Sequence, residues 1–173
     1  SIASGLPNDV TVHARLAFGL VMEGRNQEAL KAAETAVTAN PFASDAWSIR
    51  ALALDRNELY GEAIASALRA LEIDPNNAGA LAFLAQAYYN LGEYDLATST
   101  SDRALEIDAE NFEALNVRGV IAQGVEFDLL AARDYYQQAH DIAPNLPYLA
   151  IDLANIIYGI GVNSGDDAAS KQG

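Results

Sequence analysis

The stretches Leu71-Glu72-Ile73-Asp74-Pro75 and Leu105-Glu106-Ile107-Asp108-Ala109 decide the fold, because they are nearly the same sequence, 34 residues apart. The same step leads back from the first stretch to Pro41, and Pro144 lies 35 residues beyond the end of the second, as if one residue were inserted. A fixed period of about 20 to 50 residues is typical of a repeat array, in which each unit buries its apolar face against its neighbours. The chain therefore reads as one array of units of about 34 residues.

Three positions of the period hold small residues in every unit. They are Ala17, Ala51, Ala85 and Gly119; Ala29, Ala63, Ala97 and Ala132; and Ala36, Ala70, Ala104 and Ala139. Small side chains let two helices approach to about 8–10 Å. Together with the apolar periodicity they predict helices over 9–22, 26–39, 44–56, 60–73, 78–90, 94–107, 112–124, 129–142 and 147–160. Ser44 and the pair Asn76-Asn77 are placed to cap helix starts, and Gly24, Gly92 and Gly124 fall in turns between paired helices.

The spacing within one unit is more specific than its period. The tetratricopeptide pattern is an aromatic residue, x2-Leu-Gly-x2-Tyr, then Ala-x3-Phe, then Pro. The second unit follows it at Trp47, Arg50, Ala51, Leu54, Ala63, Ala67 and Pro75, and the third at Leu81, Leu84, Ala85, Tyr88, Ala97, Ser101 and Ala109. Over about residues 10 to 160 the chain resembles the tetratricopeptide repeat family.

This resemblance implies an all-α fold, a right-handed superhelical solenoid of antiparallel helix pairs. Four hairpins are expected at 10–43, 44–77, 78–111 and 112–146, followed by a closing helix at 147–160. These elements form a single array within residues 1–160, and residues 161–173 are expected to be a polar tail.

Composition limits the classes of partner. Ten basic residues stand against 24 acidic ones, which gives a formal charge of −14. Binding to phosphates needs clustered Lys and Arg, so nucleic acid and anionic membrane are unfavourable partners. No apolar run reaches the roughly 18 residues that span a bilayer, and no signal peptide is evident. The chain starts at Ser1, so we expect it to be a piece of a longer protein, and its compartment is not indicated.

No group of residues indicates catalysis. The chain has no cysteine, which excludes disulfides and thiolate chemistry. His13 and His140 fall on packing positions of the repeat, about three units apart, and a solenoid unit contacts only its neighbours. No HExxH, EF-hand or phosphate-loop pattern occurs. We therefore predict no catalytic, cofactor or metal site and interpret the chain as non-catalytic.

In the family that the chain resembles, the first helix of each hairpin lines a concave groove that binds peptides. The residues carried onto that groove are Phe18, Asp45, Ser48, Leu52, Asp55, Gln86, Tyr89, Glu113, Asn116, Val120 and Gln123. They combine apolar anchors with carboxylates and contain no Lys or Arg. The resemblance thus implies a protein–protein interaction module or scaffold that prefers a peptide or helix with apolar side chains and basic flanks. The alternatives are an element for homo-oligomerisation and the interaction domain of a larger enzyme.

Two known binding modes of the family are excluded by the same positions. A carboxylate clamp needs Lys, Asn and Arg where this chain has Ala14, Phe18, Ser48, Leu52, Ala82 and Gln86. An asparagine ladder needs Asn where it has Arg15, Ile49, Phe83 and Val117. An acidic peptide tail would consequently find no basic partner in the groove.

Two features depart from the pattern. Arg50 and Arg118 occupy a leucine position, so each is expected to be held by a carboxylate. The closing helix, 147–160, is apolar on more than one side, whereas the end of a solenoid normally turns a polar face to solvent. We therefore expect it to contact a second copy in a homodimer, or sequence of a longer parent protein.

Overall fold

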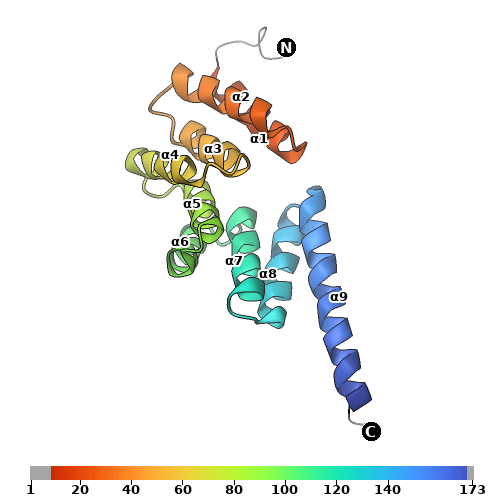
Figure 1. The fold of residues 1–173 in the computed structure, drawn as a ribbon. Helices are drawn as coiled ribbons and strands as arrows, with labels where there is room; N and C mark the ends of the chain where they lie inside the picture. The colour runs from red at the N-terminus through yellow and green to blue at the C-terminus, as the bar shows by residue number, and fades with distance from the viewer. Residues whose placement is uncertain (1–8, 171–173) are drawn as a thin grey trace.

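The computed structural model describes the backbone of residues 9–170 and the side chains of residues 9–162. Within 9–170 it contains nine helices and no strand. They are α1 (Val10–Met22), α2 (Asn26–Ala39), α3 (Ser44–Asp55), α4 (Tyr60–Ile73), α5 (Ala78–Asn90), α6 (Tyr94–Ile107), α7 (Phe112–Gly124), α8 (Leu129–Ile142) and α9 (Pro147–Ser170). The predicted all-α solenoid is confirmed, and its course is seen in Figure 1.

The helices pack as four hairpins in succession. Each first helix (α1, α3, α5, α7) contacts its own second helix and the first helix of the next unit, and α8 contacts α9. The small residues of the repeat lie at these contacts, since Ala17, Ala51 and Ala85 are each 0% exposed. The first helices thereby form one continuous inner layer, which lines the concave side of the solenoid (Figure 1).

The predicted helix caps are confirmed in part. Asn77 caps α5, because its side chain accepts a hydrogen bond of 2.8 Å from the backbone N–H of Ala80. The prediction for Ser44 is wrong, because Ser44 is the first residue of α3 and has another role. Its hydroxyl donates to the carbonyl of Ala70 and accepts from the amide of Asn77. This residue therefore joins consecutive units instead of capping its own helix.

Left-handed residues close the turns within the hairpins. Gly24 and Gly92 have φ of 74° and 82°, which agrees with their prediction as turn residues. Gly124 is different, because it is the last residue of α7, and Phe127 takes the positive φ of 57° in that turn. The inserted residue lengthens the turn and lets the next helix start from an aspartate cap, Asp128.

The last helix is longer than predicted. We expected it to end at residue 160, but α9 continues through the first part of the expected polar tail to Ser170. No proline follows Pro147, so nothing in the sequence removes a backbone donor and stops the helix. The side chains of the tail from residue 163 onward lie outside the described residues.

Candidate functional site

An open cavity of about 790 Å3 lies on the concave side of the first three units. Its walls are α1, α3 and α5, and the start of α7 closes one end. Phe18, Ile49 and Phe83 are its largest apolar lining residues, one from each of the first three units. The cavity has the size and the apolar lining that ligand sites of proteins usually have.

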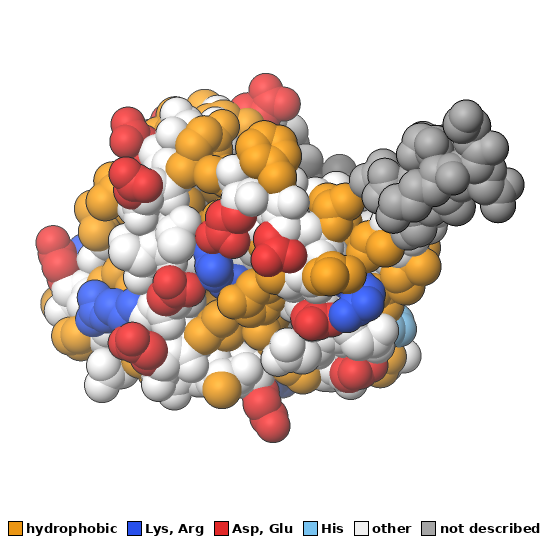
Figure 2. All heavy atoms as spheres, turned by 90° about the horizontal axis from the view of Figure 1, so that it is seen from below, with side chains coloured by type: hydrophobic (Ala, Val, Ile, Leu, Met, Phe, Trp, Pro, Cys, Tyr) orange, Lys and Arg blue, Asp and Glu red, His pale blue; other side chains and the backbone are white. Residues whose placement is uncertain are grey.

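Carboxylates surround this apolar surface. Asp45, Asp74 and Glu113 line the cavity, whereas Arg15 is the only basic residue among its described lining. Acidic side chains are also spread over the face shown in Figure 2, where the few basic ones lie beside acidic ones. The electrostatic potential of the cavity therefore favours a cationic ligand and disfavours an anionic one.

The floor of the cavity is built by contacts between units. Asn77 donates a hydrogen bond of 3.0 Å to Asp45 and so fixes this carboxylate at the rim. Ser48 is buried, and a Cβ on Gly79 would lie 3.6 Å from its hydroxyl oxygen. The glycine thus keeps the floor open beside the hydroxyl.

Glu113 has the most perturbed carboxyl group of the cavity. It lies in the first turn of α7, and burial raises its pKa to about 7; the charge of Asp108 adds to the shift, and a backbone hydrogen bond opposes it. No Lys or Arg forms an ion pair with it within the described part of the chain. A half-buried carboxyl group that has no ion-pair partner among the described residues can be stabilised by a cation from a ligand.

The groove ends where α9 begins. A second cavity of only about 20 Å3 is bordered by Phe18 and Met22 of α1 and by Tyr148 of α9. The solenoid curls so far that the start of α9 comes to the last turn of α1 (Figure 1). Close by, burial raises the pKa of Asp152, whereas its hydrogen bond from Asn116 and the charge of Arg56 oppose the shift. Side chains of this chain therefore fill the C-terminal part of the concave side.

The residues expected in the groove fall into three groups. Phe18, Asp45, Ser48 and Glu113 line the large cavity. Leu52, Gln86 and Asn116 border the small one. Asp55, Tyr89, Val120 and Gln123 are in the lining of neither cavity.

The residues of the third group have partners within the chain. Asp55 is 4% exposed and accepts a hydrogen bond of 2.8 Å from Asn90, which corrects its expected place on an open surface. Tyr89 packs on the ring of Tyr94, and Gln123 accepts from the hydroxyl of Tyr136. Val120 packs in the apolar cluster that joins α7 and α8 to Ile156 of α9.

Sequence reasoning missed part of the lining. Ile49 and Phe83 were used only as evidence against an asparagine ladder, Asp74 only as part of the repeated stretch, and Asn77 only as a helix cap. The sequence signal for Ile49 and Phe83 was the position of the period that they share. It lies three residues before the position that Phe18 and Leu52 share. A bulky apolar residue at that position of two consecutive first helices indicates a lined surface.

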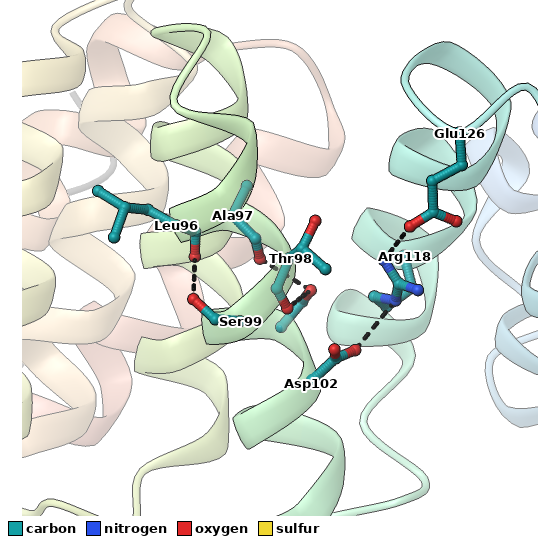
Figure 3. A network of polar contacts seen from close by, with 8 residues as sticks. Leu96, Ala97, Thr98, Ser99, Asp102, Arg118 and Glu126 are labelled. Carbon is teal, nitrogen blue, oxygen red and sulfur yellow. Dashed lines mark hydrogen bonds and ion pairs between the residues drawn. The ribbon is translucent and has the colours of Figure 1, made fainter.

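The two arginines at the leucine position behave differently. Arg118 is held by Asp102 at 3.0 Å and Glu126 at 3.1 Å, as predicted (Figure 3). Its guanidinium also lies 5.3 Å from the ring centre of Tyr135. Burial alone would lower the pKa of Arg118, but the hydrogen bond that Arg118 donates to Glu126 and the charge of Asp102 raise it.

For Arg50 the prediction of a carboxylate partner is wrong. It donates to the hydroxyl of Ser66 and stacks 5.8 Å from the ring centre of Trp47, and it forms no ion pair within the described residues. The hydroxyl and the ring replace a carboxylate because both lie in its own hairpin.

Replacing Arg118 by alanine is expected to lower the free energy of unfolding by about 1–3 kcal/mol. The change removes a guanidinium that is 11% exposed, its cation–π contact and two ion pairs. Arg69→Ala is the matched control, because Arg69 forms only an exposed pair with Glu72. Urea unfolding measures both variants, and equal losses would contradict a structural role for the Arg118 pairs.

His13 is 2% exposed and packs at its repeat position, as expected. No group of three or more metal-ligating side chains comes together among the described residues. Within the described helices we also find none that is long and apolar enough to span a membrane.

Two models of the tetratricopeptide repeat family match the sequence, one over residues 19–78 and one over residues 56–121. Together they cover more than half of the chain. The chain belongs to the tetratricopeptide repeat family. The matched residues include the parts of α3, α5 and α7 that line the large cavity. The cavity therefore lies on a surface of the tetratricopeptide repeats themselves.

Several similar proteins share the repeats at low sequence identity. A TPR repeat-containing protein of Dictyostelium discoideum is 29% identical over 158 residues; the match covers 87% of this chain and 60% of that protein. The chain thus spans about 60% of the length of this relative. A crystal structure of a thermophilic TPR protein of Thermus thermophilus has a TM-score of 0.74 at 21% identity, and the match covers 88% of this chain and 83% of that chain.

Two further structures contain tetratricopeptide arrays with partners. The APC/C hetero-tetramer Cut9–Hcn1 has a TM-score of 0.72 at 17% identity, over 92% of this chain and 32% of that chain. The first TPR of Spaghetti (RPAP3), bound to the HSP90 peptide SRMEEVD, has a TM-score of 0.57 at 20% identity, over 69% of this chain and 94% of that chain. These likenesses show the shared fold.

Proposed function

We propose that this tetratricopeptide array is a non-catalytic protein-interaction module that binds a peptide or helix in its large concave cavity. The observation that carries the proposal is the lining of that cavity, with three apolar anchors from consecutive units inside a rim of three carboxylates. Apolar side chains of a ligand that pack on such a lining provide most of the affinity, and charges at the rim select and steer the ligand. The ligand that fits is a peptide with apolar side chains and Lys or Arg beside them.

The position of α9 defines which part of the groove is used. Tyr148 and Asp152 occupy the concave side beyond α7, so the ligand binds along the first three units and ends near Glu113. A basic side chain at this end would meet the one half-buried carboxyl group of the cavity whose pKa is raised to about 7. The neighbour that holds SRMEEVD binds a peptide with three acidic side chains and only one basic one, and the present cavity has the opposite requirement.

Titration of peptides against the purified chain tests this function. We expect a peptide with one large apolar residue between Lys or Arg residues to bind at micromolar affinity or weaker, about −8 kcal/mol. Phe18→Ala is expected to weaken binding about tenfold, because this ring borders both cavities. Asp45→Asn is expected to slow association and to flatten its salt dependence.

Two controls make the test specific. Phe42→Ala removes a ring that is 76% exposed and outside both cavities, so it should leave binding unchanged. SRMEEVD serves as the acidic control peptide and should not bind. Tighter binding of acidic than of basic peptides, or equal binding by Phe18→Ala and the unaltered chain, would contradict the proposed site.

A further inference from the structure

The last helix has the sequence and the packing of a first helix without its second helix. Two positions of each first helix face the preceding unit, and they are completely buried: Ala46 and Ala53, Ala80 and Ala87, and Ala114 and Ile121. One insertion shifts the next step to 35 residues, which leads to Leu149 and Ile156 of α9, 0% and 2% exposed. Therefore α9 packs on α8 as α3, α5 and α7 pack on the second helix of the unit before them.

The same register shows which face of α9 is left uncovered by the described residues. In the first four units, the residues that correspond to Ala154 are Ala17, Ala51, Ala85 and Gly119. They are buried, and in the fourth unit the second helix covers the position, because a Cβ on Gly119 would lie 2.5 Å from the ring of Tyr136. In α9, however, Ala150 and Ala154 are exposed, and Ile157, at the position of Leu20 and Leu54, is 51% exposed.

We infer that the face of α9 formed by Ala150, Ala154, Ile157 and Tyr158 is a homodimer interface, on which α9 of a second copy lies antiparallel. A second helix is antiparallel to the first in every unit, and a two-fold axis across α9 produces the same arrangement with a single kind of helix. The small residues allow the helices to approach closely, and the apolar side chains beside them supply buried area.

The scarcity of charged residues on this face suits contact with a second copy of the chain. The chain carries a formal charge of −14, so two copies repel each other over most of their surfaces. Between Pro147 and Val162 the only charged residue is Asp152, which is partly buried and accepts a hydrogen bond from Asn116 on the groove side. The face of α9 can therefore meet its own copy with no like charges directly opposed along these residues.

The length of α9 supports the same occupant. It has 24 residues, about 36 Å, whereas each of the other described helices has 12 to 14. It extends well past α8 in Figure 1, so an antiparallel copy can pair along more than the span of one repeat. The inference is independent of the concave cavity, because the interface lies on the other side of α9 from Asp152.

Sedimentation equilibrium of the whole chain over a wide range of concentrations tests the dimer. We expect reversible dimers in the unaltered chain, and Ala154→Glu or Ile157→Glu should raise the dissociation constant about a hundredfold by opposing like charges at the axis. Leu68→Glu is the matched control, because Leu68 is exposed on α4, far from α9 in the chain. Circular dichroism identifies variants that fail to fold, and Ile157→Thr is the milder replacement at the same position. A monomer at every concentration, or equal weakening by Leu68→Glu, overturns the inference.

Cross-linking adds a positional test, because the chain has no cysteine of its own. Ala154→Cys or Ile157→Cys should form a disulfide-linked dimer under mild oxidation, since a disulfide requires Cα atoms within about 4.4–6.8 Å. Leu68→Cys should not do so at the same rate. If neither α9 variant forms cross-linked dimers faster than Leu68→Cys, the antiparallel pairing is wrong. The pairing is also wrong if the chain remains a monomer and this face of α9 binds a helix of another protein.

Discussion

Tyr136→Ala is expected to lower the free energy of unfolding by about 3–5 kcal/mol, because it empties a site in the core of the fourth unit. The ring is 2% exposed and fills the space between α7 and α8 opposite Gly119, and its hydroxyl donates a hydrogen bond of 3.0 Å to Gln123. A solenoid has units that contact only their neighbours, so the loss should concentrate in α7, α8 and α9. Hydrogen exchange measures the loss of stability helix by helix, and urea unfolding measures the total loss in the free energy of unfolding.

The large side chain of Tyr136 on α8 is accommodated by the smallest residue, Gly119, at the facing position of α7. The equivalent pairs in the first three units are Ala17 with Ala33, Ala51 with Ala67, and Ala85 with Ser101. In the fourth unit the position on α7 that faces the ring of Tyr136 is glycine, because a Cβ on Gly119 would lie only 2.5 and 2.6 Å from carbons of that ring. Gly119→Ala should therefore destabilise the chain by about 1–3 kcal/mol, although alanine is the better helix former.

The sign of this effect should reverse when the ring is absent. In the background of Tyr136→Ala, the change Gly119→Ala restores the small pair of the other units and is expected to stabilise the chain. The double-mutant cycle measures the coupling, and Tyr94→Ala on the surface is the control for the loss of a tyrosine. If the effects of the two changes are additive, the proposed accommodation of Tyr136 by Gly119 is wrong.

The period of small residues made the helices predictable. Eight of the nine described helices begin and end at the residues expected or one away, among them α2, α4 and α5. Such residues act over one turn and one neighbouring helix, so the sequence of a unit is sufficient to place them. The exception is the end of α9, which lies ten residues beyond the expected one.

The site was less predictable because it depends on accumulated geometry. Tyr148 lies near Met22 because the rotation between successive units accumulates over four units. No sequence pattern within one unit specifies this proximity. Asp55 was expected in the groove, but its partner Asn90 comes from the next unit, 35 residues away. Similarly, Ser66 and Trp47 replaced the expected carboxylate of Arg50, because a hydroxyl and a ring can hold a guanidinium as well.

Glu113→Gln is expected to stabilise the chain at pH 8 and to leave its stability unchanged near pH 4. Burial raises the pKa of Glu113 from an ordinary value of 4.5 to about 7, so the folded state binds a proton more tightly than the unfolded state. Stability therefore falls as the pH rises between these two values, by at most about 3 kcal/mol. Glutamine is uncharged at every pH and removes this dependence. Burial raises the pKa of Asp55 and Asp152 as well, which adds to the slope in the same direction.

Urea unfolding of both chains at several pH values measures the difference. The control is Glu106→Gln, which removes the same charge from an exposed position of α6. A parallel pH dependence of Glu113→Gln and the unaltered chain would show that Glu113 is not the group that titrates.

The same carboxyl group connects stability to binding. A Lys or Arg of a ligand beside Glu113 would favour the ionised form, so binding of a basic peptide should release a proton near neutral pH. Its affinity is accordingly expected to increase as the pH rises from about 5 to about 8, whereas Glu113→Gln binds with little dependence on pH. Calorimetry in two buffers of different ionisation enthalpy measures the proton directly. Binding without proton release near pH 7 would show that the cation of the ligand lies elsewhere in the cavity, at Asp45 or Asp74, because these carboxylates are the other acidic groups of its lining.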